Sequence, residues 1–144
     1  MTDPDLLRFI ESQDGTHDRA RAELAAGRKR SHWMWFVFPQ LDGLGHSATA
    51  RRYAISDLGQ ARRYLADRVL GDRLRRDVEL TLRHQGLSAT DLLGSPDDLK
   101  FRSCLTLFAE AASDPVDKAL FGKALNLFYD GKPDPRTLEL LGSG

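Results

Sequence analysis

The sequence predicts a single, compact, all-α domain, an orthogonal bundle of about seven to nine short helices spanning residues 1–144. Three observations lead to this fold class. Residues that begin or end helices recur densely, apolar residues recur every three or four positions, and the two-residue alternation of a half-buried strand is almost absent. With 144 residues, 41% of them hydrophobic, the chain is long enough to bury a core without disulfides or metals.

Helix-start and helix-stop residues divide the chain into its elements. Three pairs have the spacing of a capping box: Asp57 with Gln60, Ser88 with Asp91, and Ser95 with Asp98. Three prolines stand at a first helical position: Pro96, Pro115 and Pro135. Three glycines stand where a helix would end in the left-handed conformation: Gly86, Gly94 and Gly131. Helices are therefore expected over residues 4–12, 17–26, 57–66, 69–85, 88–93, 96–112, 115–129 and 135–141.

Apolar residues at helical spacing mark the faces expected to turn inward. Three of the expected helices carry such a stripe: Leu70, Leu74, Val78 and Leu82; Phe101, Leu105, Phe108 and Ala112; and Val116, Leu120, Ala124 and Phe128. We expect these faces to form the core.

The stretch from His32 to Phe38 fits two local structures. Its aromatic and β-branched residues suit a strand, whereas Ser31 could cap a short buried helix that ends before Pro39. The helical interpretation is favoured because the rest of the chain is helical.

Several short motifs are distinctive. Residues 31–40 read SHWMWFVFPQ, and GLGHS at 43–47 and RRYAI at 51–55 follow them. These motifs resemble the uncharacterised bacterial family catalogued as domain of unknown function 1810. Further similarity covers nearly the whole chain: LGDRL at 70–74, DDLK at 97–100, SCLTLF at 103–108 and GKPDPRTL at 131–138. The resemblance implies a compact, mainly helical fold and a bacterial origin, but it supplies no activity and no catalytic residue.

Composition argues against several classes of protein. No apolar run approaches the roughly 20 residues that cross a bilayer, and the first ten residues lack the features of a secretory signal. The single cysteine, Cys104, fits a cytoplasmic location and is interpreted as an inert core thiol. The net charge is zero, which disfavours a nucleic-acid partner. No metal site is expected, because the histidines and the cysteine lack ligand spacing.

One segment departs from a generic helical domain. Both tryptophans, Trp33 and Trp35, follow directly on three basic residues at 28–30. Aromatic faces stack on bases and cations bind phosphates, so this mixture suits a nucleotide-derived ligand. The alternative is that the aromatic rings form the core of a small domain. If residues 31–37 form a helix, His32 and Trp35 share one face while Trp33 packs inside.

The helix expected over 96–112 carries polar residues in an apolar setting. Lys100, Ser103 and Thr106 step three residues at a time along one side. Two interpretations remain open. These residues line the same cleft as His32, or Ser103 and Thr106 donate hydrogen bonds back to the preceding helical turn.

These considerations define a candidate site. Its proposed proton-transfer residues are His32 and Lys100, and its proposed ligand-binding residues are Arg28, Arg30, Trp35, Gln40, Arg51 and Ser103. In this hypothesis Trp35 is the stacking surface and the arginines hold an anion. The glycine-rich loop at 43–47 is either a tight turn or an additional anion site. No cofactor can be named.

Three classes of function fit the sequence. The favoured one is a small-ligand enzyme or sensor for a nucleotide or an ADP-ribose-like metabolite, and the sequence does not decide whether it catalyses a reaction. The second is a protein-interaction module without catalysis, which presents arginine-rich helix faces such as 62–76. The third is a nucleic-acid-binding module that uses the basic residues at 28–30, 51–52 and 62–63.

Overall fold

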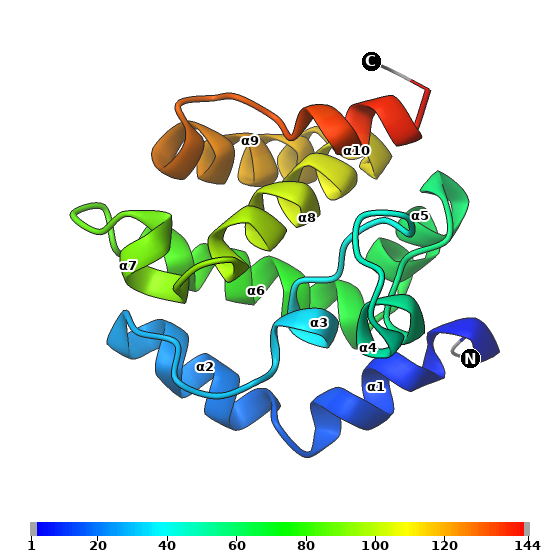
Figure 1. The fold of residues 1–144 in the computed structure, drawn as a ribbon, viewed down its shortest axis with the longest axis horizontal. Coiled ribbons are helices and arrows are strands. Elements are labelled where there is room, and N and C mark those ends of the chain that lie inside the picture. The colour runs from blue at the N-terminus through cyan, green and yellow to red at the C-terminus, as the bar shows by residue number, and fades with distance from the viewer. Residues whose placement is uncertain (1–2, 143–144) are drawn as a thin grey trace.

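The computed structural model describes residues 3–142, and within them the regular elements are all helices, joined by loops that hold one isolated β-bridge, between Leu41 and Ile55 (Figure 1). A 3-10 turn, η1 (Pro4–Leu6), precedes ten α-helices: α1 (Leu7–Asp14), α2 (His17–Ala26), α3 (Met34–Val37), α4 (Ala48–Arg52), α5 (Leu58–Ala66), α6 (Leu70–Leu82), α7 (Ala89–Leu93), α8 (Asp97–Ala111), α9 (Pro115–Tyr129) and α10 (Pro135–Leu140). The all-α fold class is confirmed. The helix count is slightly above the predicted range. The short helix favoured for the stretch from His32 to Phe38 forms as α3, but it begins at Met34 and the Ser31 hydroxyl donates to Glu23 instead of capping it, whereas α4 was not expected.

Helix α8 forms the centre of the molecule. It packs against α5, α7, α9 and α10, and in Figure 1 it runs between α9 and α10 on one side and α1 and α2 on the other. Because neighbours surround it, α8 is buried nearly all round, including the side chains of Phe101, Cys104, Leu105 and Phe108. The core is therefore built around this helix.

Most of the expected caps form. The carboxylates of Asp114 and Asp134 accept hydrogen bonds from the first turns of α9 and α10, and each is followed by a proline at the first helical position. Ser88 and Asp91 form both halves of a capping box. Asp57 caps α5, but the side chain of Gln60 accepts from the backbone of Ser56 rather than completing a box.

Two of the predicted helix boundaries are wrong. The Ser95–Asp98 capping box is absent because α8 begins at Asp97 with Pro96 as its N-cap, and the Asp98 carboxylate accepts from the Thr90 hydroxyl instead. Gly94 and Gly131 have positive φ angles, as predicted. Gly86 does not, because α6 ends at Leu82 with Arg83 as its C-cap, before the chain reaches Gly86. 

The predicted inner face of α9 is also wrong in part. Val116 is 74% exposed, and the buried residues of this helix are Asp117, Phe121, Ala124 and Leu125. Ala124 is buried as predicted, and Leu120 and Phe128 pack against the core. Asp117 faces α6, where its carboxylate lies 2.7 Å from Nε of Arg75, and the adjacent Val116 faces solvent.

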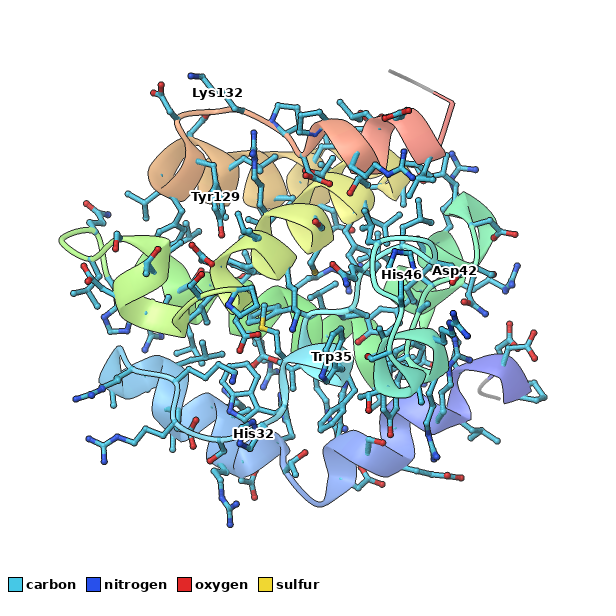
Figure 2. All side chains as sticks on the ribbon, in the orientation of Figure 1. His32, Trp35, Asp42, His46, Tyr129 and Lys132 are labelled. Carbon is cyan, nitrogen blue, oxygen red and sulfur yellow. The ribbon has the colours of Figure 1, made fainter. Side chains whose placement is uncertain are left out.

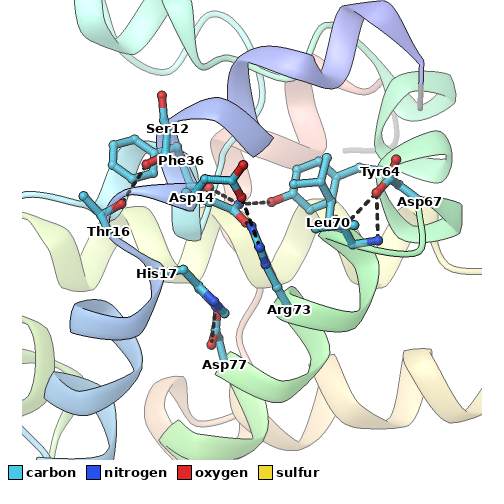
Figure 3. Close-up of polar contacts among 12 residues, drawn as sticks. Ser12, Asp14, Thr16, His17, Phe36, Tyr64, Asp67, Leu70, Arg73 and Asp77 are labelled. Carbon is cyan, nitrogen blue, oxygen red and sulfur yellow. Dashed lines mark hydrogen bonds and ion pairs between the residues drawn. The ribbon is translucent and has the colours of Figure 1, made fainter. Parts of the chain in front are cut away.

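A buried polar network joins the first two helices to α3 and α6 (Figure 3). The amide of Gln13 donates to the carbonyl of Phe36 at 2.7 Å and contacts the Tyr64 hydroxyl at 3.1 Å. Nearby, Nε2 of His17 lies 3.0 Å from the Asp77 carboxylate. Burial raises the pKa of Asp77, and the hydrogen bond with His17 partly offsets that rise. Through Gln13 this network fixes the position of α3, which carries Trp35.

Within residues 3–142, none of the helices combines the length and the apolar character that a bilayer crossing requires.

Candidate ligand-binding site

The loop between α2 and α3 is held by one carboxylate. Gly27, with φ of +81°, ends α2 and turns the chain. The Glu23 carboxylate then accepts hydrogen bonds from the backbone N–H of Arg30 at 2.7 Å, from that of Ser31 at 2.9 Å and from Nε1 of Trp33 at 2.9 Å. Burial raises the pKa of Glu23, but these hydrogen bonds and one from the Ser31 hydroxyl outweigh it and lower the pKa to about 2.

The two tryptophans at the end of this loop differ in their surroundings. Trp33 is 1% exposed and packs in the core beside Phe38. Trp35 lies on α3 and is only half-buried. Trp33 therefore has the core role that the sequence offered as an alternative for the aromatic residues, and Trp35 is available at the surface.

Two lysines from distant parts of the chain meet beside these rings. Nζ of Lys100 lies 3.7 Å from the ring centroid of Trp35, a cation–π contact. Nζ of Lys29 lies 5.2 Å from the ring of Trp33. Asp97 joins them, with its carboxylate 2.8 Å from Nζ of Lys29 and 3.2 Å from Nζ of Lys100. We call these five residues the lysine–tryptophan cluster.

Within ion-pair distance the charges of this cluster do not balance, and the next negative charge is the Glu23 carboxylate, which accepts from Nε1 of Trp33. The side chains of Lys29, Asp97 and Lys100 are only 9%, 18% and 20% exposed. In the described residues 3–142, Asp97 is the one carboxylate within ion-pair distance of either ammonium group. Two largely buried positive charges thus share one negative charge, and charges removed from water are normally paired. The cluster is electrostatically suited to an additional anion.

A depression adjoins Trp35. A Cβ added at Gly45 would lie 2.6 Å from Cβ of Ala50, 3.6 Å from Nε2 of Gln40 and 3.8 Å from Cζ3 of Trp35. Gly45 is therefore required for close packing at this point. It also lines an open depression of about 500 Å³ with the following residues: Asp42, Gly43, His46, Arg51, Ala54 and Ser56.

The structure brings some of the predicted site residues together. Trp35 and Lys100 are in contact, Gln40 lies beside Gly45 next to Trp35, and Arg51 lines the adjoining depression. The side chains of Arg28 and Arg30 are exposed on the loop that also carries Lys29.

His32 and Ser103 lie outside this arrangement. His32 is exposed, and Figure 2 shows it beside α2, on the opposite side of Trp35 from His46 and Asp42. The expected helical face shared by His32 and Trp35 does not form, because α3 begins only at Met34. Ser103 is 6% exposed and its hydroxyl donates to the carbonyl of Leu99 at 3.2 Å, which confirms the back-bonding interpretation.

Asp97 was not among the predicted site residues, and Lys29 was included only within the basic run at residues 28–30. The spacing of Asp97 and Lys100, three positions apart on a helix, was a usable signal for their ion pair. Nothing in the sequence connects Lys29 with Asp97, because the contact depends on how the loop after α2 packs against α8.

Comparisons with known proteins agree with this fold. The family model described as Protein of unknown function (DUF1810) matches residues 3–141. The crystal structure of the conserved hypothetical protein Rv1873 from Mycobacterium tuberculosis is similar to this chain, with a TM-score of 0.92 and 48% sequence identity. The similarity covers 97% of this chain and 99% of that chain. No curated protein matches the sequence.

Proposed function

The chain belongs to the family of proteins of unknown function DUF1810, and we propose that it binds an anionic, nucleotide-like small molecule at the lysine–tryptophan cluster. The ligand class is a nucleotide or an ADP-ribose-like metabolite. The observation that carries this proposal is the shared carboxylate of Asp97, which leaves one positive charge of Lys29 and Lys100 without a partner.

The cluster offers the two kinds of contact that a nucleotide needs. The ammonium groups of Lys29 and Lys100 bind a phosphate, and the partial burial of the site strengthens this attraction relative to a solvent-exposed pair. The half-buried ring of Trp35 offers a surface on which a base stacks. Arg28 and Arg30 are exposed on the same loop and add positive charge at the rim.

The depression beside Gly45 extends this site. One of its lining residues, Gly45, lies next to Trp35, and Arg51, His46 and Asp42 also line it. A ligand longer than a simple phosphate would reach from the cluster, past Trp35, into this depression. This extension favours a ligand that carries both a ring and a phosphate over a bare inorganic anion.

Binding, rather than processing, is the function that the geometry supports. Lys100 is ion-paired to Asp97 and covers a face of Trp35, an arrangement that suits charge recognition. His32, the other candidate for proton transfer, makes no hydrogen bond to a described residue that would orient its ring. A general acid or base has to be positioned to act.

The local partners of other arginines favour a small ligand over nucleic acid. Arg62 donates from Nε to the carbonyl of Ala111 at 3.2 Å, and Arg63 pairs with Asp3 at 2.7 Å. The basic pair that was expected to join a nucleic-acid surface is thus engaged within the chain. Together with the net charge of zero, this supports a compact anionic ligand.

A thermal-shift panel tests the proposal. The probes are inorganic phosphate, ADP, ATP, NAD and ADP-ribose. A ligand at about 100 times its dissociation constant stabilises the native state by about 2.7 kcal/mol, which corresponds to roughly 5–11 °C for a chain of this length. We expect such a shift with a nucleotide-type probe and a smaller one with phosphate.

Variants connect the shift to the site. Lys100→Met and Lys29→Met should abolish most of the shift, because methionine keeps the apolar volume and removes the charge. Lys132→Met is the matched control, since that side chain is 72% exposed and lies far from Trp35 in Figure 2. A panel without any shift, or shifts of equal size in all three variants, would contradict the proposal.

A further inference from the structure

The outer face of α9 carries a stripe of side chains in which Val116 and Leu127 are exposed and Leu120 is partly buried against the core. The stripe consists of Val116, Leu120, Lys123 and Leu127, at successive spacings of four, three and four residues. Val116 is 74% exposed and Leu127 is 36% exposed. Leu82 of α6 lies beside them, and together they line two adjoining depressions of about 540 and 550 Å³. Val116, Leu120, Leu82 and Leu127 thus give these two depressions apolar walls, and apolar hollows at a surface are typical of interaction sites.

The spacing of the stripe indicates what kind of surface packs on it. Alternating steps of three and four residues are typical of a helix that lies along another helix. The inner side of α9 is already occupied, because Phe121 and Ala124 are fully buried against the rest of the domain. The outer stripe is therefore a second packing face on the same helix.

Two charges on this face complement each other. Glu79 of α6 and Lys123 of α9 line the same depression. In residues 3–142 neither of them takes part in an ion pair, whereas the neighbouring Arg75 is paired with Asp117. A two-fold axis that passes between Glu79 and Lys123 brings each of these charges opposite its counterpart on the other copy, so this face can be complementary to a copy of itself.

We propose that two copies of this chain associate through the α6–α9 face, defined by Glu79, Leu82, Val116, Leu120, Lys123 and Leu127. The α9 helices pack along their outer stripes about a two-fold axis. Glu79 of each copy faces Lys123 of the other. This proposal is independent of the ligand site, which involves α3 and the start of α8.

Sedimentation equilibrium from micromolar to near-millimolar concentration tests the association. We expect a monomer–dimer equilibrium for the wild-type chain. Val116→Asp should raise the dissociation constant of the dimer about tenfold or more, because it places two like charges in an apolar contact. Val69→Asp is the matched control, since Val69 is 38% exposed at the other end of α6 and should leave the dimer intact. A wild-type chain that stays monomeric throughout, or a Val116→Asp dimer of unchanged affinity, would overturn the proposal.

A charge swap tests the pairing itself. Glu79→Lys alone and Lys123→Glu alone should each weaken the dimer. In each variant, positions 79 and 123 carry the same charge, so both contacts between the two copies become repulsive. An equimolar mixture of the two variants should associate again, because every contact in the mixed dimer joins opposite charges. A mixture that associates no better than either variant alone would exclude the proposed pairing. An unchanged circular dichroism spectrum of each variant shows that it is folded and separates this outcome from misfolding.

Discussion

Asp97 shows how one side chain decides the character of the site. Its carboxylate lies within 3.2 Å of the ammonium groups of both Lys29 and Lys100, so it holds them together without neutralising both. Trp35 and Lys100 were predicted as site residues from their chemistry, and they prove to be in contact. His32 was predicted on the same grounds, but its exposure depends on the path of an irregular loop, which residue periodicity does not describe.

Glu23 is predicted to stabilise the loop that carries Lys29. Glu23→Gln should lower the free energy of unfolding at neutral pH by about 1–3 kcal/mol, because an amide cannot accept all the hydrogen bonds that the carboxylate receives. The folded pKa of about 2 lies below the ordinary value of 4.5. The stabilisation is therefore present above pH 4.5 and is lost as the pH falls from 4.5 towards 2.

Urea denaturation of both proteins between neutral pH and pH 2 measures this effect. The difference in free energy of unfolding between wild type and Glu23→Gln should shrink over the acid range. The exposed Glu11→Gln is the control and should show little difference at any pH. A difference for Glu23→Gln that does not change with pH would contradict the assigned role.

Gly45 is predicted to be required for the shape of the site. In Gly45→Ala the new Cβ would lie 2.6 Å from Cβ of Ala50, so α4 or the loop must move, at a cost of about 1–3 kcal/mol. Ala50→Gly in the same chain removes the clash and should restore part of the lost melting temperature. Gly15→Ala is a control with no atom within 4 Å of the added methyl group. If Gly45→Ala melts like Gly15→Ala, the close approach is not present in solution.

At the scale of elements, the eight expected helices all form, because their caps and apolar spacing are local properties of the sequence. The short helix α3 was favoured over a strand because the rest of the chain is helical, and α4, with five residues, is too short for periodicity to reveal. Of the predicted inner stripe of α9, Ala124 is buried and Leu120 and Phe128 pack against the core, whereas Val116 is exposed. Periodicity finds an apolar face, but the rotation of a helix also depends on contacts between distant residues, such as the ion pair between Arg75 and Asp117, 42 positions apart.

Helix α9 offers a prediction at this scale. Asp114→Ala removes the cap that accepts from the backbone N–H of Val116 at 2.8 Å. The loss of an N-cap costs about 0.5–2 kcal/mol, and Pro115 remains to favour the helical start. Thermal unfolding followed by circular dichroism should show a lower melting temperature. Ser113 is an exposed neighbour of the cap, so the control variant Ser113→Ala should melt like the wild type. Equal losses of melting temperature in both variants would argue against the cap.

At the scale of the whole molecule, the sequence predicts the fold class but not the arrangement of the helices. Which helices become neighbours depends on contacts between residues far apart in sequence, such as Gln13 with Tyr64 and Lys29 with Asp97. The same contacts create the ligand site, in which α3, α8 and the loop after α2 each contribute. The residue types at the site could be predicted, whereas their geometry required the assembled fold.

The central claim is that an anionic, nucleotide-like molecule binds beside Trp35. The most direct measurement is a fluorescence titration with ADP-ribose, because Trp35 lies at the proposed site, whereas Trp33, the other tryptophan of the chain, is buried in the core. We predict a saturable change in tryptophan emission that is lost in Trp35→Phe and requires much more ligand in the Lys29→Met, Lys100→Met double variant. A saturable change that persists in Trp35→Phe, with an unaltered dissociation constant in the double variant, would contradict the account.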